Sequence, residues 1–445
     1  MRVSVVGTGY VGLVSGVCLA EMGHSIVCVD IDQAKVDKIN QGIPPIYEEG
    51  LDDLLKKHIH QSLKATTDLR TAVLETDLSI IAVGTPFDGK NIDLRFIKTV
   101  AQQIGEVLKD KQDYHVVVVK STVVPGTTDT VVLPILELAS EKGAGEAFGV
   151  GMNPEFLKEG EAIKDFMTPD RIVLGGIDDK TIAVLRDLYS VFDSVDKLET
   201  NCKTAEMIKY TANSLLATMI SFSNEIGNLC AVTKDVDVVE VMEGVHLDKR
   251  LTPILPNGER VIPGFTSYLE AGCGFGGSCF PKDVKALKAY GEQQQSPMPL
   301  LSAVLDLNAQ QPLKMIDLLT QHFPSLHSVQ VAVLGLAFKP GTDDMRESPA
   351  IPVVKYLLEQ GAIIQAYDPI ACHEAQKLFG TSNIQYCDSL ATALADVQAA
   401  MIMTRWPEFH SISQILQEQN AQPVVIDGRR MLDKLQVEKY EGIGL

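Results

Sequence analysis

Short apolar runs alternate with longer segments of helical periodicity through the first 200 residues of the chain. The runs cover residues 3–6, 25–30, 79–83, 115–120, 148–152 and 171–174. Runs of this length and composition, in alternation with helical stretches, are typical of a parallel sheet with helices on both faces. We therefore predict a doubly wound α/β domain over residues 1–200.

The pattern changes between residues 204 and 232, where apolar residues recur at helical spacing and no proline occurs. This segment predicts one long helix that serves as a spine between domains or at a subunit contact. A loop rich in proline and glycine follows over residues 252–281, and helix resumes after it. We therefore predict a central helical domain over residues 201–322, through which the chain forms a homodimer.

The last third of the chain repeats the first pattern. Apolar runs cover residues 329–334, 363–368, 399–403 and 424–427, and the first of them is followed by Gly335. Residues 323–445 are thus predicted to form a second doubly wound domain. The predicted fold class is α/β, with two Rossmann-like domains joined by a long central helix and a helical region.

Composition narrows the class of protein. The 445 residues are 45% hydrophobic and 22% charged, which is ordinary for a globular protein of two or three domains. A formal net charge of −19 disfavours nucleic acid and anionic membrane surfaces as partners. We find no apolar run long enough for a membrane span and no signal peptide at the start. The eight cysteines are scattered without zinc-type spacing, from which we expect reduced thiols, no metal and a cytoplasmic location.

The first apolar run leads into a glycine fingerprint. Gly7, Gly9 and Gly12 have GxGxxG spacing between a strand and a helix, and Asp30 ends the next strand. Such glycines admit a pyrophosphate to the helix N-terminus, and the carboxylate accepts hydrogen bonds from the ribose hydroxyls. Because a carboxylate there repels a 2′-phosphate, we predict NAD rather than NADP. Lys35 is either close to the adenosine or a solvated helix lysine.

Cys279 is the candidate nucleophile. A lone cysteine is usually an inert small hydrophobe, but this one follows Gly-Gly-Ser, is predicted to open a helix, and has Lys282 and Asp283 within one turn. Cations and a helix N-terminus both stabilise a thiolate. A cysteine beside a nicotinamide can hold an aldehyde as a thiohemiacetal and then a thioester, so one site could oxidise a primary alcohol to a carboxylate. Lys339, after a strand of the last domain, either contacts a phosphate or is structural.

Several ordered motifs together resemble the UDP-glucose/GDP-mannose dehydrogenase family, and the resemblance covers essentially the whole chain. The segments that carry it are Gly7-Thr-Gly-Tyr-Val-Gly-Leu13, Lys120-Ser-Thr-Val-Val-Pro-Gly-Thr127, Asn153-Pro-Glu-Phe-Leu-Lys-Glu-Gly160, and residues 213–225, 274–283 and 335–349. The loop over residues 251–273 is longer than in the family, which leaves the role of Arg250 and the alignment of residues 268–272 open.

The resemblance implies a set of catalytic roles. Cys279 would form the thiohemiacetal and the thioester. Lys209 and Asn213, four positions apart on the predicted long helix, would bind the sugar and stabilise the oxyanion. Asp283, with a water held by Thr122, would accept the proton. Glu155 would contact the substrate and assist hydrolysis of the thioester. Judged without the family, Glu155, Glu159 and Asn213 are ordinary surface or capping residues.

The resemblance also implies two binding sites. The cofactor site would comprise Gly7, Gly9, Tyr10, Val11, Gly12, Asp30, Lys35, Thr85, Thr122, Glu159, Lys282 and Arg346. The substrate site would comprise Glu155, Phe156, Leu157, Lys158, Lys209, Asn213, Arg250, Tyr268, Leu269, Glu270, Ala271, Gly272, Gly276 and Lys339.

The implied reaction is the four-electron oxidation of UDP-glucose to UDP-glucuronate by NAD. The same chemistry on GDP-mannose or on a UDP-N-acetylhexosamine is the first alternative. Enzymes for acetamido sugars tend to have histidine where this chain has Ser278, which argues mildly against that branch. A nucleotide-sugar binder without turnover is the second alternative.

Overall fold

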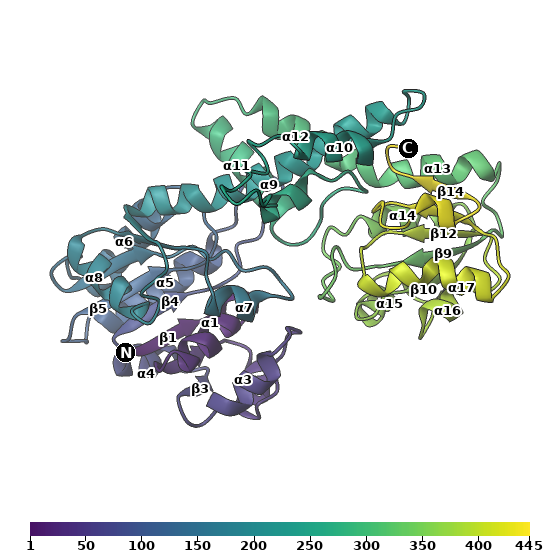
Figure 1. Cartoon of the computed structure of the whole chain (residues 1–445). Helices are drawn as coiled ribbons and strands as arrows, with labels where there is room; N and C mark the ends of the chain where they lie inside the picture. The colour runs from purple at the N-terminus through teal and green to yellow at the C-terminus, as the bar shows by residue number, and fades with distance from the viewer. The chain divides into compact units, whose positions relative to one another are not determined.

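A computed structural model describes every residue from Met1 to Leu445. The chain divides into two compact units, Met1–Ala212 and Asn213–Leu445 (Figure 1). The boundary falls within one long helix, α9 (Cys202–Cys230), which is the helix that the apolar pattern predicts. No helix of the chain combines the length and apolar character that crossing a bilayer requires.

The first unit is built on an eight-stranded sheet of order β3-β2-β1-β4-β5-β6-β7-β8. Its strands are β1 (Arg2–Val6), β2 (Ser25–Val29), β3 (Leu63–Thr66), β4 (Leu78–Ile81), β5 (His115–Val119), β6 (Phe148–Met152), β7 (Ile172–Gly176) and β8 (Lys197–Thr200). Its helices are α1 (Tyr10–Glu21), α2 (Gln33–Asn40), α3 (Leu51–His58), α4 (Leu69–Glu75), α5 (Arg95–Leu108), α6 (Leu133–Ser140), α7 (Ala162–Met167) and α8 (Asp179–Leu188).

Both faces of this sheet are buried, which explains its continuous apolar strands. In β5, Val116 and Val118 pack into the core that contains α1, whereas Val117 and Val119 pack into the core that contains α5. Successive side chains of a strand point to opposite faces, so the four successive valines of β5 serve two cores at once. The predicted doubly wound fold is confirmed.

Two strands depart from the expectation of a parallel sheet, because β8 pairs in parallel with the reversed strand β7. β7 pairs with β6 in the antiparallel direction, through Gly151 with Gly176 and Met152 with Gly175. Hydrophobic pattern does not encode strand direction, because both directions bury the same residues. An antiparallel neighbour lets the connection between the two strands return along one edge of the sheet. The segment over residues 153–171 therefore stays at the carboxyl edge.

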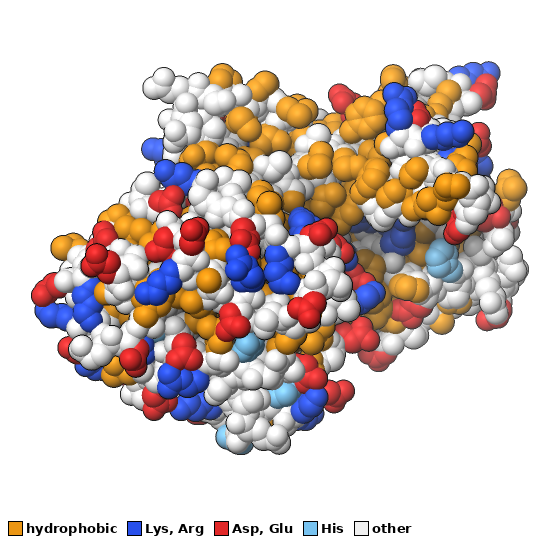
Figure 2. Space-filling view, turned by 60° about the vertical axis from the view of Figure 1, so that its left-hand side comes forward, with side chains coloured by type: hydrophobic (Ala, Val, Ile, Leu, Met, Phe, Trp, Pro, Cys, Tyr) orange, Lys and Arg blue, Asp and Glu red, His pale blue; other side chains and the backbone are white.

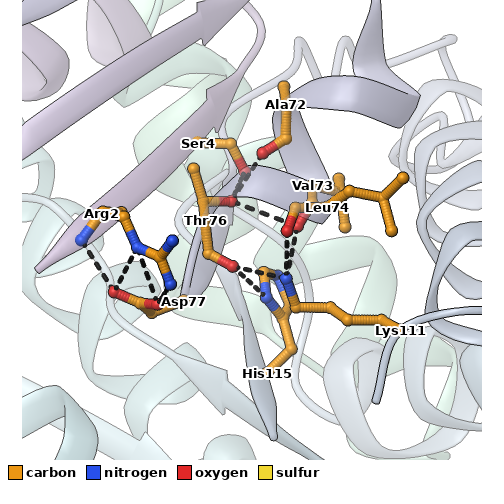
Figure 3. A network of polar contacts seen from close by, with 9 residues as sticks. All are labelled: Arg2, Ser4, Ala72, Val73, Leu74, Thr76, Asp77, Lys111 and His115. Atoms are coloured by element: carbon orange, nitrogen blue, oxygen red, sulfur yellow. Dashed lines mark hydrogen bonds and ion pairs between the residues drawn. The ribbon is translucent and has the colours of Figure 1, made fainter. Parts of the chain in front are cut away.

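The opposite, amino edge of this sheet holds a polar network that fastens the end of α4 (Figure 3). The Lys111 ammonium donates to the carbonyls of Val73, Leu74 and Thr76 at 2.8–2.9 Å. The His115 ring also contacts the Thr76 carbonyl, and burial lowers the pKa of His115 to about 3. The last carbonyls of a helix lack the usual partners of the helix interior, so the lysine acts as a C-terminal cap of α4.

The second unit joins a helical region to a six-stranded parallel sheet of order β11-β10-β9-β12-β13-β14. The helical region contains the rest of α9 with α10 (Val238–His246), α11 (Phe280–Gln293), α12 (Pro299–Gln310) and α13 (Lys314–His322). The sheet contains β9 (Gln330–Leu334), β10 (Ile363–Tyr367), β11 (Ile384–Tyr386), β12 (Ala399–Ile402), β13 (Val424–Asp427) and β14 (Tyr440–Gly442). Its helices are α14 (Ala350–Glu359), α15 (Cys372–Phe379), α16 (Leu390–Ala393) and α17 (Ile412–Glu418).

Candidate active site

A first group of predicted site residues lies at the carboxyl edge of the first sheet. Parallel strands β1, β2, β4, β5 and β6 all end there, and each is followed by at least one residue that the sequence singles out. These residues are Gly7, Asp30, Thr85, Thr122 and Glu155. The order of the strands reverses between β1 and β4, and ligands of open α/β sheets bind at such a point.

The glycine fingerprint forms a cradle that fits a dinucleotide. Gly7 has a φ of +100°, and a Cβ there would lie 2.7 Å from the Ala82 carbonyl oxygen. A Cβ on Gly12 would lie 1.9 Å from the Gly7 carbonyl oxygen, so the turn packs closely against the helix. Gly9, the N-cap of α1, has no atom within 4 Å of its Cβ position. The N-terminus of α1, with Tyr10 and Val11, is therefore open to a pyrophosphate group.

Asp30 lies at the end of β2 beside this turn. Its Oδ2 accepts hydrogen bonds from the Thr8 backbone N–H and hydroxyl at 2.8 and 2.6 Å. Burial opposes ionisation of Asp30, but hydrogen bonds from Thr8 and Asp32 outweigh it and keep the pKa of the carboxyl below its usual value. A carboxylate held in this way can still accept from ribose hydroxyls. Lys35 is half-buried on α2 and contributes to the lowered pKa of Asp30.

Thr85 and Thr122 come together behind the cradle. The Thr85 hydroxyl donates to the Thr122 carbonyl at 2.7 Å. The neighbouring Ser121 hydroxyl donates to the Val83 carbonyl, also at 2.7 Å. The loops after β4 and β5 are thus joined by two hydrogen bonds, which hold two predicted cofactor-site residues, Thr85 and Thr122, together.

Glu155 and Lys209 form a buried ion pair. The Lys209 Nζ lies 3.1 Å from the Glu155 Oε1, and the two side chains are 4% and 7% exposed. The other carboxylate oxygen accepts from the Leu157 N–H at 2.7 Å. Burial opposes ionisation of Glu155, but the Lys209 ammonium prevails and keeps the pKa of the carboxyl below its usual value. Glu155 is therefore not the surface or capping residue that its local sequence suggests.

A small cavity adjoins this pair. Its volume is about 80 Å³, and Lys120, Asn153, Glu155 and Tyr189 are among the residues that line it. Phe156 forms part of the wall, and the Arg171 guanidinium lies 4.0 Å from the centre of its ring. Lys158 is exposed and pairs with Glu161 and Asp165.

Lys120 is a buried cation to which the sequence assigned no role. Its Nζ donates to the Asn153 Oδ1 at 2.8 Å, and the Tyr189 hydroxyl donates to the same oxygen at 2.6 Å. Burial lowers the pKa of Lys120 to about 8. The signal that could have found it is a lysine that directly ends an all-apolar strand. Lys120 joins the ends of β5 and β6, from which Thr122 and Glu155 follow.

Glu206 is a second buried charge missed in the sequence. From α9, its carboxylate accepts from the N–H groups of Gly126 and Thr128 at 2.5 and 2.8 Å. Burial raises the pKa of Glu206 to about 7. The carboxylate caps the start of the helical segment after the Thr122 loop and holds that loop against α9, one turn from Lys209.

A second group of predicted site residues lies in the second unit, around Cys279. Cys279 is half-buried and is the N-cap of α11, as its sequence context predicts. Pro281 in the first turn favours a helix start at this point. The Asp283 N–H donates to the Cys279 carbonyl at 2.8 Å, so the first turn is closed directly behind the thiol. A thiol at a helix N-terminus is placed where a thiolate is stabilised.

Asp283 connects the cysteine helix to α9. The Asn213 Nδ2 donates to the Asp283 Oδ2 at 2.6 Å, and the Lys282 Nζ lies 2.5 Å from the other oxygen. Asp283 is 1% exposed. An amide and an ammonium group on a buried carboxylate hold it in a fixed place, as a proton acceptor requires. The structure therefore brings three of the predicted site residues into contact.

Other parts of the second unit pack closely against the glycines that precede the cysteine. A Cβ on Gly276 would lie 2.2 Å from the Glu347 carbonyl oxygen, and one on Gly277 would lie 2.7 Å from the Phe338 ring. Arg346 pairs with Asp344 at 2.8 Å, and its side chain is 64% exposed. Lys339 is half-buried, with its Nζ 5.9 Å from the centre of the Phe338 ring.

The long loop before the cysteine is ordered by local contacts. Arg250 pairs with Asp248, and its side chain is 88% exposed. Ile254 and Arg260 form an antiparallel bridge, so the additional residues fold into a small hairpin.

The segment after this hairpin is held from several elements. The Gly272 N–H donates to Asn224 of α9 and its carbonyl accepts from Gln311, both at 2.8 Å. Leu269 and Ala271 are buried in the core of the unit, the Tyr268 ring packs against Phe280, and Glu270 pairs with Arg405.

Comparisons with known proteins cover the whole chain. Models of the UDP-glucose/GDP-mannose dehydrogenase family match residues 1–193 (NAD binding domain), 203–310 (central domain) and 332–434 (UDP binding domain). A UDP-glucose 6-dehydrogenase from Haloferax volcanii is 42% identical over 448 residues, which cover 100% of both chains. A GDP-mannose 6-dehydrogenase from Pseudomonas aeruginosa is 41% identical over 403 residues, covering 89% of this chain and 88% of the relative.

A similar structure has also been solved. The UDP-glucose dehydrogenase from the archaeon Pyrobaculum islandicum superimposes with a TM-score of 0.89 at 38% sequence identity. The match covers 100% of this chain and 97% of that one.

Proposed function

Because this chain belongs to the UDP-glucose/GDP-mannose dehydrogenase family, we propose that it oxidises the C6 alcohol of UDP-glucose to the carboxylate of UDP-glucuronate. The balanced reaction consumes two NAD+ and one water and releases two NADH and three protons. NAD+ is the electron acceptor, and the glycine cradle at Gly9 and the Asp30 carboxylate would hold it. The two full-length relatives with named sugar substrates support this family of reactions.

The side chains divide the chemistry between them. Asp283 accepts the proton of the alcohol, as a buried carboxylate fixed by Asn213. The Cys279 thiolate adds to the aldehyde carbon to give a thiohemiacetal, whose oxidation leaves a thioester. Lys209 stabilises the negative oxygen, and Glu155 assists the attack of water that releases the carboxylate.

One observation favours full oxidation to the carboxylate over oxidation that stops at the aldehyde. Cys279 is the N-cap of α11, and Asp283 in the first turn of the same helix is held by Asn213. An enzyme that stops at the aldehyde needs a base but has no use for a nucleophilic thiol. A binder without turnover needs neither group in this arrangement.

The first prediction concerns the number of electrons removed. We expect two NADH per UDP-glucose consumed, with no aldehyde released, because the thiol retains it as a covalent adduct. Absorbance of NADH against sugar nucleotide consumed measures this ratio directly. One NADH per sugar would contradict the thioester route. GDP-mannose and a UDP-N-acetylhexosamine, assayed in the same way, test the alternative substrates, and a higher kcat/KM for either would reassign the substrate.

We further propose that the enzyme is a homodimer assembled through the central helical domain, residues 201–322. Leu215, Phe222 and Leu229 lie seven residues apart on α9 and are 58%, 50% and 60% exposed. Residues at this spacing share one face of a helix, so they form an apolar stripe. In Figure 2, hydrophobic side chains gather at the height of helices α9 to α12 in Figure 1. A second copy of the same stripe can cover this surface symmetrically.

The second prediction follows from the stripe. Phe222→Glu is expected to halve the mass in solution, because a carboxylate cannot be buried between two apolar faces. Light scattering after size exclusion measures the mass. Leu138→Glu, on an exposed position of α6, is the matched control and should leave the mass unchanged. A wild-type monomer, or a Phe222→Glu variant with the wild-type mass, would refute this interface.

The eight cysteines, none of them in a disulfide, support a cytoplasmic location as part of this proposal.

A further inference from the structure

Glu48 is a buried carboxylate outside the predicted site, with hydrogen-bond donors from two separate parts of the first unit. It is 6% exposed, although the loop that carries it is largely at the surface. Its Oε1 accepts from the Ala162 N–H at 2.7 Å, and its Oε2 accepts from the Gly160 N–H at 2.7 Å. The Tyr10 hydroxyl donates to the same Oε2. Three donors on one buried carboxylate form a fixed polar junction.

The first donor belongs to the dinucleotide fingerprint. Tyr10 follows Gly9 directly and is the first residue of α1, so its backbone forms part of the cradle. Burial and the Glu48 carboxylate raise the pKa of the Tyr10 phenol, which keeps it a donor at neutral pH. Its oxygen also accepts from the Gly160 N–H at 3.1 Å.

The other donors end the acidic segment that begins at Glu155. Gly160 has a φ of +81°, and Ala162 starts α7, whose N-cap side chain makes no capping hydrogen bond. Glu48 therefore caps α7 from elsewhere in the chain. Within the segment, Glu155 accepts from Leu157, and Asp165 accepts from the Lys158 N–H. Those contacts are local, whereas Glu48 and Tyr10 link the segment to the cofactor half of the domain.

Glu48 itself has a rigid support. Its carbonyl accepts from the Leu51 N–H at the start of α3. Leu51 and Leu55 of α3 are fully buried in the core that contains α1. A carboxylate held by α3 can therefore position both the first turn of α1 and the turn at Gly160.

We propose that Glu48 is a positioning residue that couples the dinucleotide fingerprint, through Tyr10, to the segment that carries Glu155 and Glu159. Loss of the carboxylate frees the Gly160 turn and moves Glu155 away from its best position against Lys209. It also frees Tyr10 and loosens the backbone that receives the cofactor. The proposal uses the proposed reaction only for its turnover readout.

Glu48→Gln and Tyr10→Phe test this coupling. In Glu48→Gln, an NH2 group replaces one of the two acceptor oxygens. This new donor would face the N–H and O–H donors that surround residue 48. We expect kcat to fall about tenfold in Glu48→Gln and about threefold in Tyr10→Phe, with a rise in the NAD+ dissociation constant in both. The double variant should be no worse than Glu48→Gln alone, since both break one junction. Glu49→Gln and Tyr47→Phe, on exposed neighbours in the same loop, are matched controls.

The measurements separate this idea from the proposed reaction. Calorimetric titration with NAD+ alone requires no sugar, so its result stands whatever the substrate proves to be. Kinetics with UDP-glucose, at a temperature where all variants are folded, then give kcat and KM. Wild-type kcat and NAD+ affinity in Glu48→Gln would overturn the proposal, even if its melting temperature falls. Effects of the two substitutions that multiply in the double variant would also overturn it.

Discussion

Replacing Cys279 by serine is expected to lower kcat for complete oxidation by at least about a thousandfold. A serine hydroxyl is far less acidic than a thiol, so it does not form the anionic nucleophile that the reaction requires. The variant should fold normally, because the exchange is nearly isosteric and residue 279 is only half-buried at its N-cap position. Steady-state NADH production and the melting temperature measure the two effects.

The partial reactions make this test specific. Formation of the aldehyde needs the base but not the thiol, so a single-turnover experiment should still give up to one NADH per active site. Cys387→Ser, at a buried cysteine of the last domain, is the matched control and should keep full activity. Normal turnover by the Cys279→Ser variant would remove the nucleophile from the mechanism.

The parts of the site that sequence predicted are those with local signals. The fingerprint at Gly7, Gly9 and Gly12 follows from backbone sterics within one turn, and the structure shows both the close contacts and the open position. Cys279 as a helix start follows from Pro281 and the glycines before it. Sequence contains such information because the residues that define the feature are adjacent in the chain.

Long-range contacts between polar residues left no such signal. Glu48 meets Gly160 across 112 positions, and Glu206 meets Gly126 across 80. By their local sequence, Glu48 and Glu206 are both ordinary surface glutamates. Their burial depends on the order and direction of strands, including the antiparallel β7, which the apolar pattern does not encode.

Short edge strands were missed for a related reason. β3 and β8 form the edges of the first sheet, and β11 and β14 form those of the second. β8 has the sequence Lys-Leu-Glu-Thr and no fully buried residue. An edge strand packs on fewer neighbours and needs little apolar surface, so hydrophobic pattern cannot separate it from a loop. None of these strands contributes a predicted site residue.

Replacing Lys209 by methionine is expected to combine a loss of activity with a loss of stability. The variant leaves Glu155, 7% exposed, with a negative charge that only the Leu157 N–H and more distant groups compensate. Breaking a buried pair in this way costs about 3–5 kcal/mol of unfolding free energy. We expect kcat to fall by at least about a thousandfold, because the cation that stabilises the oxyanion is gone. Lys203→Met, at an exposed position on the same helix, should change neither quantity.

The pH dependence identifies the cause of this instability. The lowered pKa of Glu155 means that the pair stabilises the wild type above the ordinary pKa of a glutamate, near 4.5, and that this stabilisation is lost as pH falls through the lowered value. The difference in unfolding free energy between wild type and Lys209→Met should therefore be largest at neutral pH and shrink in acid. Urea denaturation at pH 7.5 and at pH 4 would measure it.

A second substitution then separates charge from chemistry. Adding Glu155→Gln to Lys209→Met removes the unpaired charge and should restore most of the stability but none of the activity. Recovery of activity in that double variant would mean that Lys209 serves only to neutralise Glu155. If the difference in unfolding free energy between wild type and Lys209→Met stays constant from pH 7.5 to pH 4, the loss of the buried ion pair is not the cause of the instability.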